Sequence, residues 1–371
     1  MGKRRDKGEG SIYQRASDNM YVAYCNLADG KRKYIYAKTR GEIVKKLKAL
    51  QRNIEAGTHV ERRPETVQAF FTYWLEIHAS QVKATTIATY ASHLKPVYAA
   101  IGHVKLQALT PDKIQRMYSD LEKKVSSNTV RGVHMALNAA FKDAVRWKFI
   151  SINPCASVDA PKFKKFYGTV LNGVQARTLI DWSKDTELEC FIVLALTLAL
   201  RRGEITGLKW SDIDLDIKTL TVQRTVSKIV GGYLEGEAKT EHSNRVLLIP
   251  EVTLAMLKRH RAKQNAQRLA APAWTDLNLV YPCESGGYTK TSTLTNRFSA
   301  VLIEAGLPHV RIHDLRHSCA TLLLSLGVPA IVVSQILGHS STKITQDVYG
   351  HVLPAMQDEA MQKIDMLFGG F

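Results

Sequence analysis

The chain has 371 residues, of which 45% are hydrophobic, and it carries 51 Lys and Arg residues against 34 Asp and Glu residues. This length predicts two or three domains with sizeable cores, and the ordinary apolar content argues against wholesale disorder. The formal net charge of +17 predicts a polyanionic partner, most commonly nucleic acid, although a ribosome or an anionic membrane surface would attract the same charge.

The cysteines and the apolar runs indicate the cellular compartment of the protein. The five cysteines are widely spaced and include no CxxC pair, which argues against a disulfide framework and a structural zinc site and favours a reducing cytosol. The N-terminal stretch MGKRRDKGEG lacks the apolar region of a secretory signal. The most apolar run, FIVLALTLAL at residues 191–200, is too short to span a bilayer. We therefore expect a cytoplasmic protein without a membrane partner.

Residues 1–60 are predicted to form a small basic domain with a three-stranded sheet and a helix. Two β-rich runs flank Asp29-Gly30, a dipeptide suited to a tight hairpin turn, and GSIYQR supplies a third strand. Thr39 and Glu42 match a capping box, which predicts a helix that ends at Gly57. The segment holds 14 Lys and Arg against 6 Asp and Glu. Its hairpin cations are candidate DNA contacts, with a solvated surface as the alternative: Lys31, Arg32, Lys33 and Lys38.

Residues 65–150 are predicted to form an all-helical bundle. A stripe at helical spacing opens it: Val67, Phe70, Phe71, Trp74 and Leu75. Further helices are expected at residues 85–100, 111–123 and 128–147, and these stripes are interpreted as core. The following segment, residues 152–166, has two prolines, a lysine cluster and no periodicity, which is typical of a linker.

The rest of the chain, residues 167–371, is predicted to be a mixed α+β domain. Apolar helices at 174–182 and 190–200 precede two strand-like runs, TLTVQRT and NRVLLIP. Lys239 lies between these runs, where a hairpin tip is expected.

Cationic and polar residues recur through this domain in the order Arg, Lys, His-x-x-Arg, His and Tyr. The domain has no acidic cluster for Mg²⁺ and no GxxxxGK loop. Phosphoryl transfer without a metal needs fixed cations to balance charge on the phosphate oxygens, and a tyrosine can act as the covalent nucleophile. A zinc site at His313 and His317 is disfavoured because HDLRH lacks the HExxH glutamate. The candidate catalytic residues are Arg201, Lys239, His313, Arg316, His339 and Tyr349.

Four stretches together resemble the tyrosine recombinase (phage integrase) family: LRRGEITGLKWSDID, KTEHSNRVLLIP, HDLRHSCATLLLSLGVP and LGHSSTKITQDVYGH. The resemblance covers nearly the whole chain. It implies an arm-type DNA-binding domain at 1–60, a helical core-binding (SAM-like) domain at 65–150, and a catalytic domain at 167–371 with a C-terminal exchange helix. The implied fold class is multidomain and mainly α with small β-sheets. Ala199 departs from the family pattern, which commonly has glycine there, and we expect its methyl to tighten helix packing without removing a reagent.

The resemblance implies a site-specific DNA recombinase that integrates and excises a mobile element through a 3′-phosphotyrosyl intermediate. Tyr349 would be the nucleophile, and Arg201 and Arg316 would clamp the non-bridging oxygens of the scissile phosphate. Lys239 would protonate the leaving 5′-oxygen as general acid. A non-catalytic DNA-binding regulator, a nicking-closing topoisomerase and a chromosome-dimer resolvase are the alternatives.

The two histidines would assist the reaction. His313 would help to transfer the tyrosine proton, and His339 would hydrogen-bond the phosphate. The resemblance implies no cofactor, and it implies core and arm attachment sites on double-stranded DNA as partners. A homotetramer in synapsis, a possible directionality factor and DNA-bending proteins are also expected, in the cytoplasm of a bacterial host.

Overall fold

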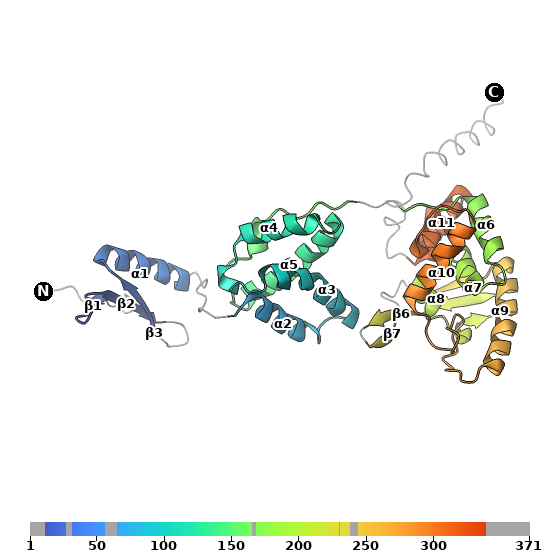
Figure 1. Cartoon of the computed structure of the whole chain (residues 1–371), viewed down its shortest axis with the longest axis horizontal. Helices are drawn as coiled ribbons and strands as arrows, with labels where there is room; N and C mark the ends of the chain where they lie inside the picture. The colour runs from blue at the N-terminus through green and yellow to red at the C-terminus, as the bar shows by residue number, and fades with distance from the viewer. Residues whose placement is uncertain are drawn as a thin grey trace, which may run out of the picture. The chain divides into compact units, whose positions relative to one another are not determined.

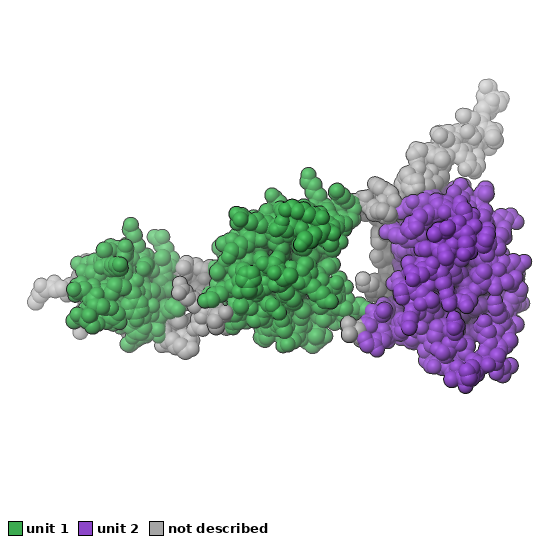
Figure 2. Space-filling view, in the orientation of Figure 1, with its two compact units in different colours: residues 1–165 green, residues 166–371 purple. Residues whose placement is uncertain are grey.

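The computed structural model describes residues 12–26, 32–55, 65–164, 168–229, 231–237 and 244–338. The chain divides into two compact units, residues 1–165 and residues 166–371, which Figure 2 colours green and purple. Among the described helices, none is both long enough and apolar enough to cross a membrane. The prediction of a mainly helical protein with small β-sheets is confirmed (Figure 1).

The first unit begins with a three-stranded antiparallel sheet and a helix: β1 (Ile12–Gln14), β2 (Tyr21–Asn26), β3 (Arg32–Ala37) and α1 (Arg40–Glu55). Alternate strand residues face α1, and Ala23, Ile43 and Leu47 are buried in their shared core. The helix starts where Thr39 Oγ1 accepts a hydrogen bond from the Glu42 N–H at 3.3 Å, which is half of the expected capping box. The predicted Asp29-Gly30 turn lies outside the described residues.

Helices make up the remainder of this unit: α2 (Val67–His78), α3 (Ala84–Ile101), η1 (Leu106–Ala108), α4 (Pro111–Glu122), α5 (Ser127–Arg146) and η2 (Pro154–Ser157). The apolar stripe of α2 is buried as predicted except at Leu75, which is partly buried, and Phe71 and Trp74 are fully enclosed. The Trp74 indole N–H donates to Asp143 Oδ2 of α5 at 2.8 Å, so its one polar group is satisfied inside the core.

The second unit mixes helices and short strands: α6 (Gly173–Ser183), α7 (Glu189–Thr197), α8 (Arg202–Thr206), η3 (Trp210–Asp212), β4 (Ile213–Asp214), β5 (Thr219–Val222), β6 (Arg224–Ile229), β7 (Gly232–Glu237), β8 (Arg245–Leu248), α9 (Glu251–Ala270), α10 (Thr291–Glu304), α11 (Ile312–Ser325) and α12 (Ala330–Leu337). β4, β5 and β8 form one antiparallel sheet, and β6 and β7 form a separate hairpin. The apolar helix α7 is buried on nearly all sides and forms the centre of the core.

Two features of this unit differ from the sequence predictions. The run TLTVQRT contributes to two strands of different sheets, which are separated by Gln223. The Gln223 side chain donates to Asp212 Oδ1 at 2.6 Å. The predicted helix at 190–200 ends at Thr197, because Ala199 adopts a left-handed conformation with φ of 51°.

Candidate active site

Two of the predicted arginines converge on the C-terminal end of α12. Arg201 Nη2 donates to the Gly338 carbonyl at 3.2 Å, and Arg316 Nη2 donates to the adjacent carbonyl of Leu337. The last carbonyls of a helix have no partner within it, and they carry partial negative charge that attracts cations. Folding therefore brings together two guanidiniums from separate segments, one at the residue before α8 and one on α11.

Arg316 is almost fully buried, with 3% of its surface exposed. Its Nη1 donates to the carbonyl of Ala199 at 2.7 Å. The left-handed backbone at Ala199 turns the chain between α7 and Arg201, so this carbonyl links the two arginine-bearing segments. A buried charge fixed by backbone carbonyls keeps its orientation, which favours recognition of an anion.

Glu204 lies beside Arg201 and is shared with a further arginine, Arg245 of β8. Its Oε1 accepts from Arg201 Nη1 at 2.7 Å, and its Oε2 accepts from Arg245 Nη2 at 2.9 Å. Burial opposes ionisation of this carboxyl, but the hydrogen bond and charge of Arg245, together with the charge of Arg201, hold its pKa below the ordinary range. One carboxylate therefore sits between two guanidiniums, and the cluster retains net positive charge.

His313 stands at the start of α11, one turn before His317, and the two rings meet edge to face with centroids 5.1 Å apart. Burial, followed by the positive charge that His317 and Arg316 would add, lowers the pKa of His313 to about 4, although part of the residue remains exposed. Its imidazole is therefore neutral at pH 7, and a neutral imidazole can accept a proton.

Three predicted catalytic residues, Lys239, His339 and Tyr349, lie outside the described residues. The described hairpin β6–β7 ends two residues before Lys239, and it turns at Gly231, where φ is 86°. The tip of this hairpin therefore precedes Lys239, whereas the sequence pattern places Lys239 at a tip.

The hairpin is attached to the body of the unit through Glu235 of β7. Glu235 Oε1 accepts from Lys209 Nζ at 2.9 Å, and Oε2 accepts from the Tyr288 hydroxyl at 2.9 Å. Arg224 of β6 pairs with Glu235 and also with Asp212. These contacts fix the strand from which the chain continues toward Lys239.

The predicted DNA-contacting cations of the first unit occupy different places on the sheet. Arg32 lies on the face that α1 leaves open, whereas Lys33 is paired with Cys25 on the face that carries the buried residues. Lys38 follows β3 and is exposed, and Lys31 lies outside the described residues.

Tyrosines share the open face of the sheet with Arg32. Tyr13, Tyr34 and Tyr36 are between 42% and 48% exposed. The Arg32 guanidinium lies 4.9 Å from the centroid of the Tyr24 ring, and this ring is 5.5 Å from that of Tyr34. Side chains of this kind combine apolar contact, hydrogen bonding and positive charge on one surface.

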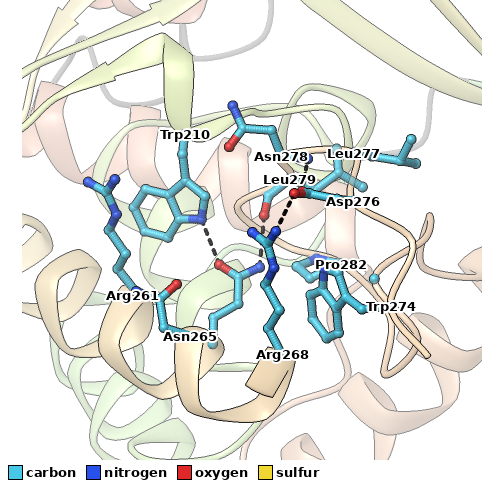
Figure 3. Close-up of a pocket in the computed structure, with 12 residues that line it drawn as sticks. Trp210, Arg261, Asn265, Arg268, Trp274, Asp276, Leu277, Asn278, Leu279 and Pro282 are labelled. Atoms are coloured by element: carbon cyan, nitrogen blue, oxygen red, sulfur yellow. Dashed lines mark hydrogen bonds and ion pairs between the residues drawn. The ribbon is translucent and has the colours of Figure 1, made fainter. Parts of the chain in front are cut away.

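A cavity of about 120 Å³ lies in the second unit between α9 and the loop after it (Figure 3). Its walls include Trp210, whose indole N–H donates to Gln264 at 2.6 Å, and Arg268, which pairs with Asp276 at 2.7 Å. Of the candidate catalytic residues that the structure describes, Arg201, His313 and Arg316, none lines it. The first contact attaches η3 to α9 and the second attaches the loop to α9, so we interpret the cavity as a feature of packing.

The arrangement is suited to reactions at a phosphate. Two guanidiniums held in place by carbonyls can neutralise charge on non-bridging oxygens, and a neutral histidine on the same helix as Arg316 can take up a proton. Within the part of the chain that the structure describes, no three His, Cys, Asp or Glu side chains are grouped to hold a metal ion.

Sequence reasoning missed Arg245 and the tyrosine face. Arg245 lies within the stretch KTEHSNRVLLIP, at the point where a strand was predicted to start, and a charged residue that opens an apolar strand-like run was the available signal. The tyrosines alternate along β3 in KYIYA, so their common face follows from the two-residue period of a strand.

Comparisons with known proteins agree over almost the whole chain. Residues 169–356 match the model of the phage integrase family, and residues 66–122 match that of the phage integrase N-terminal SAM-like domain. A tyrosine recombinase XerC-like protein of Caldanaerobacter subterraneus is 29% identical over 360 residues, covering 91% of this chain and 92% of the relative. An integrase of Streptomyces ambofaciens is 27% identical over 383 residues, covering 97% of each chain.

Solved structures of low sequence identity have the same fold. A Tn1549 transposon integrase in complex with a circular intermediate DNA superposes with a TM-score of 0.66 at 18% identity, covering 80% of this chain and 99% of that chain. A lambda integrase tetramer bound to a Holliday junction superposes with a TM-score of 0.58 at 17% identity, covering 94% and 97%.

Proposed function

This chain belongs to the phage integrase family, and we propose that it cleaves and rejoins DNA at specific sites through a covalent bond to Tyr349. The observation that carries this proposal is the convergence of Arg201 and Arg316 on the end of α12. Two fixed cations at one point provide what a phosphoryl-transfer transition state needs when no metal takes part.

In the proposed reaction, the Tyr349 hydroxyl oxygen attacks the scissile phosphorus while the bond from phosphorus to the 5′-oxygen breaks. The product is a 3′-phosphotyrosyl link and a free 5′-hydroxyl. Arg201 and Arg316 would bind the non-bridging oxygens, on which negative charge increases in the transition state. The reverse reaction, with the 5′-hydroxyl of another strand, reseals the DNA without ATP.

Proton transfers are assigned to three further residues. Lys239 would protonate the leaving 5′-oxygen, and its pKa would be lowered by the surrounding cations. His313, neutral at pH 7, would accept the proton that Tyr349 releases. His339 would hydrogen-bond the scissile phosphate.

The remaining parts of the chain are assigned to recognition and assembly. Residues 65–150 would grip the core site with the catalytic domain, and the open sheet face of residues 1–60 would bind a separate arm site with Arg32 and its neighbouring tyrosines. By analogy with the lambda integrase tetramer on a Holliday junction, four copies would assemble on two duplexes. We expect this assembly on DNA inside the bacterial cell, with a directionality factor or DNA-bending proteins as further partners.

The test is to trap the covalent adduct on a nicked attachment-site duplex and to resolve it by denaturing electrophoresis. Wild-type protein should form the adduct, whereas Tyr349→Phe should form none and keep its DNA affinity. Tyr233→Phe, a change of the same kind on β7, should still form it.

Two outcomes would contradict the proposal. An adduct formed by Tyr349→Phe would mean that another residue is the nucleophile. Relaxation of arbitrary supercoiled plasmid by the monomer, without pairing of sites, would identify a topoisomerase.

A further inference from the structure

Arg245 is a third guanidinium at the end of α12, behind the two arginines assigned to the phosphate. Its Nε donates to the Ile336 carbonyl at 2.8 Å, and its Nη2 donates to Glu204 Oε2 at 2.9 Å. The fit is close, since a Cβ at Gly338 would lie 2.9 Å from Arg245 Nη1. Arg245 therefore fills the space between Glu204 and α12.

The exposure of the two arginines at Glu204 gives them different roles. The Arg201 side chain is 35% exposed, whereas those of Arg245 and Glu204 are 7% and 4% exposed. Arg201 is therefore the more open of the two to an incoming phosphate, whereas Arg245 is held by Glu204 and by the Ile336 carbonyl. We expect Arg245 to affect the reaction through the groups that it contacts.

Arg245 changes the net charge of the group formed by Arg201 and Glu204. With Arg245 in place, two guanidiniums share one carboxylate, and one positive charge remains in excess. Without Arg245, Arg201 and Glu204 would form a neutral pair in a buried setting, where charges interact strongly. A neutral pair attracts a phosphate far less than a cluster with an excess cation.

We propose that Arg245 is a positioning residue for strand cleavage. It shares Glu204 with Arg201, so that Glu204 does not fully offset the charge with which Arg201 attracts the scissile phosphate. This rests on the proposed role of Arg201 in the phosphate clamp. In the cleavage step, the bond from the tyrosine oxygen to phosphorus forms and the bond from phosphorus to the 5′-oxygen breaks. Arg245 exchanges no proton in this step. It affects the step by limiting how far Glu204 offsets the charge of Arg201.

The first experiment measures single-turnover cleavage by the full chain on nicked DNA with either an ordinary phosphate or a methylphosphonate at the scissile position. The methylphosphonate has a methyl group in place of one non-bridging oxygen and carries no charge. Arg245→Met should slow cleavage of the ordinary phosphate by about 10-fold or more, with DNA affinity unchanged. On the methylphosphonate, the loss should shrink to about threefold or less, because less charge needs balancing.

A second variant separates charge from packing. Glu204→Gln combined with Arg245→Met restores the excess positive charge and should recover much of the rate lost in Arg245→Met. A purely structural role predicts the opposite, because the double variant has lost more hydrogen bonds. Arg224→Met is the matched control: it removes another poorly exposed, ion-paired arginine of the same unit and should slow both substrates equally.

The outcomes distinguish this inference from the proposed function. Equal slowing of both substrates by Arg245→Met, or a double variant slower than the single one, would overturn the positioning role. Arg201→Ala calibrates the clamp: if it cleaved the ordinary phosphate at the wild-type rate, the proposed function of Arg201 would fail, and the role of Arg245 would fall with it.

Discussion

Ala199 holds a left-handed backbone, with φ of 51°, at the point where α7 ends and the arginine segment begins. This conformation explains why glycine suits the position, and it costs an alanine about 1–2 kcal/mol. Its methyl is fully buried beside Cys319 and Leu337, which offsets part of that cost. The methyl thus fills a small core, as expected, but the backbone strain was not foreseen.

Substitutions at Ala199 should therefore have unequal effects. Ala199→Gly should change the free energy of unfolding by less than about 1 kcal/mol, because relief of strain and loss of the methyl oppose one another. Ala199→Val should lower it by about 2 kcal/mol or more, because a β-branched residue is both strained and too large there. Urea denaturation would measure both, and equal tolerance of valine and glycine would show that the strain is absent.

The depressed pKa of His313 predicts a pH dependence of stability. Its pKa is about 4 in the folded protein and close to 6.5 in an unfolded chain. Between these values the unfolded state binds more protons, so stability should be complete above about pH 6.5 and should fall as pH falls toward 4. In urea denaturation at pH 7.5 and pH 5, His313→Gln should lose less stability than wild type. An identical loss would assign the acid sensitivity to other groups.

At the scale of elements, the five-residue helix α8 is too short to be stable alone and is held against β6. A Cβ at Gly203 would meet the side chain of Thr225 and lie 2.9 Å from the carbonyl of Val226. The helix that begins after Arg201 thus lies directly on the hairpin that leads toward Lys239.

This close approach predicts opposite results for two glycines. Gly203→Ala should lower the free energy of unfolding by about 1–3 kcal/mol, because α8 or β6 must move. Gly236→Ala, on β7 with no atom within 4 Å of the added Cβ, should change it little. Urea denaturation of both variants provides the comparison, and a tolerated alanine at Gly203 would mean that the two elements are not in rigid contact.

At the scale of the whole molecule, the N-terminal sheet and the helices after it bury separate sets of apolar residues. Ala23, Ile43 and Leu47 belong to one core, and Phe71 and Trp74 belong to another. Removal of one core need not expose the other.

Deletion of residues 1–60 should consequently leave a folded protein that cleaves the core site and has lost affinity for arm sites. Gel-shift titrations with each DNA, over a range of salt concentrations, would measure this. If arm-site affinity survives the deletion, the N-terminal sheet is not the reader of that site. In the full chain, Tyr34→Ala should weaken arm-site binding, whereas Leu326→Ala, an exposed apolar residue of the second unit, should not.

Sequence alone is enough to predict the class of the fold, the order of most elements and the kinds of reagent, because apolar periodicity and residue chemistry are local properties. Val67 to Trp74 is readable as a buried stripe from spacing alone. Three features are visible only in the folded chain: TLTVQRT belongs to two sheets, Ala199 is left-handed, and Glu204 is shared with Arg245. These features depend on contacts between segments far apart in the chain, where a buried charge must find its partner. No pattern along the sequence records which partner folding supplies.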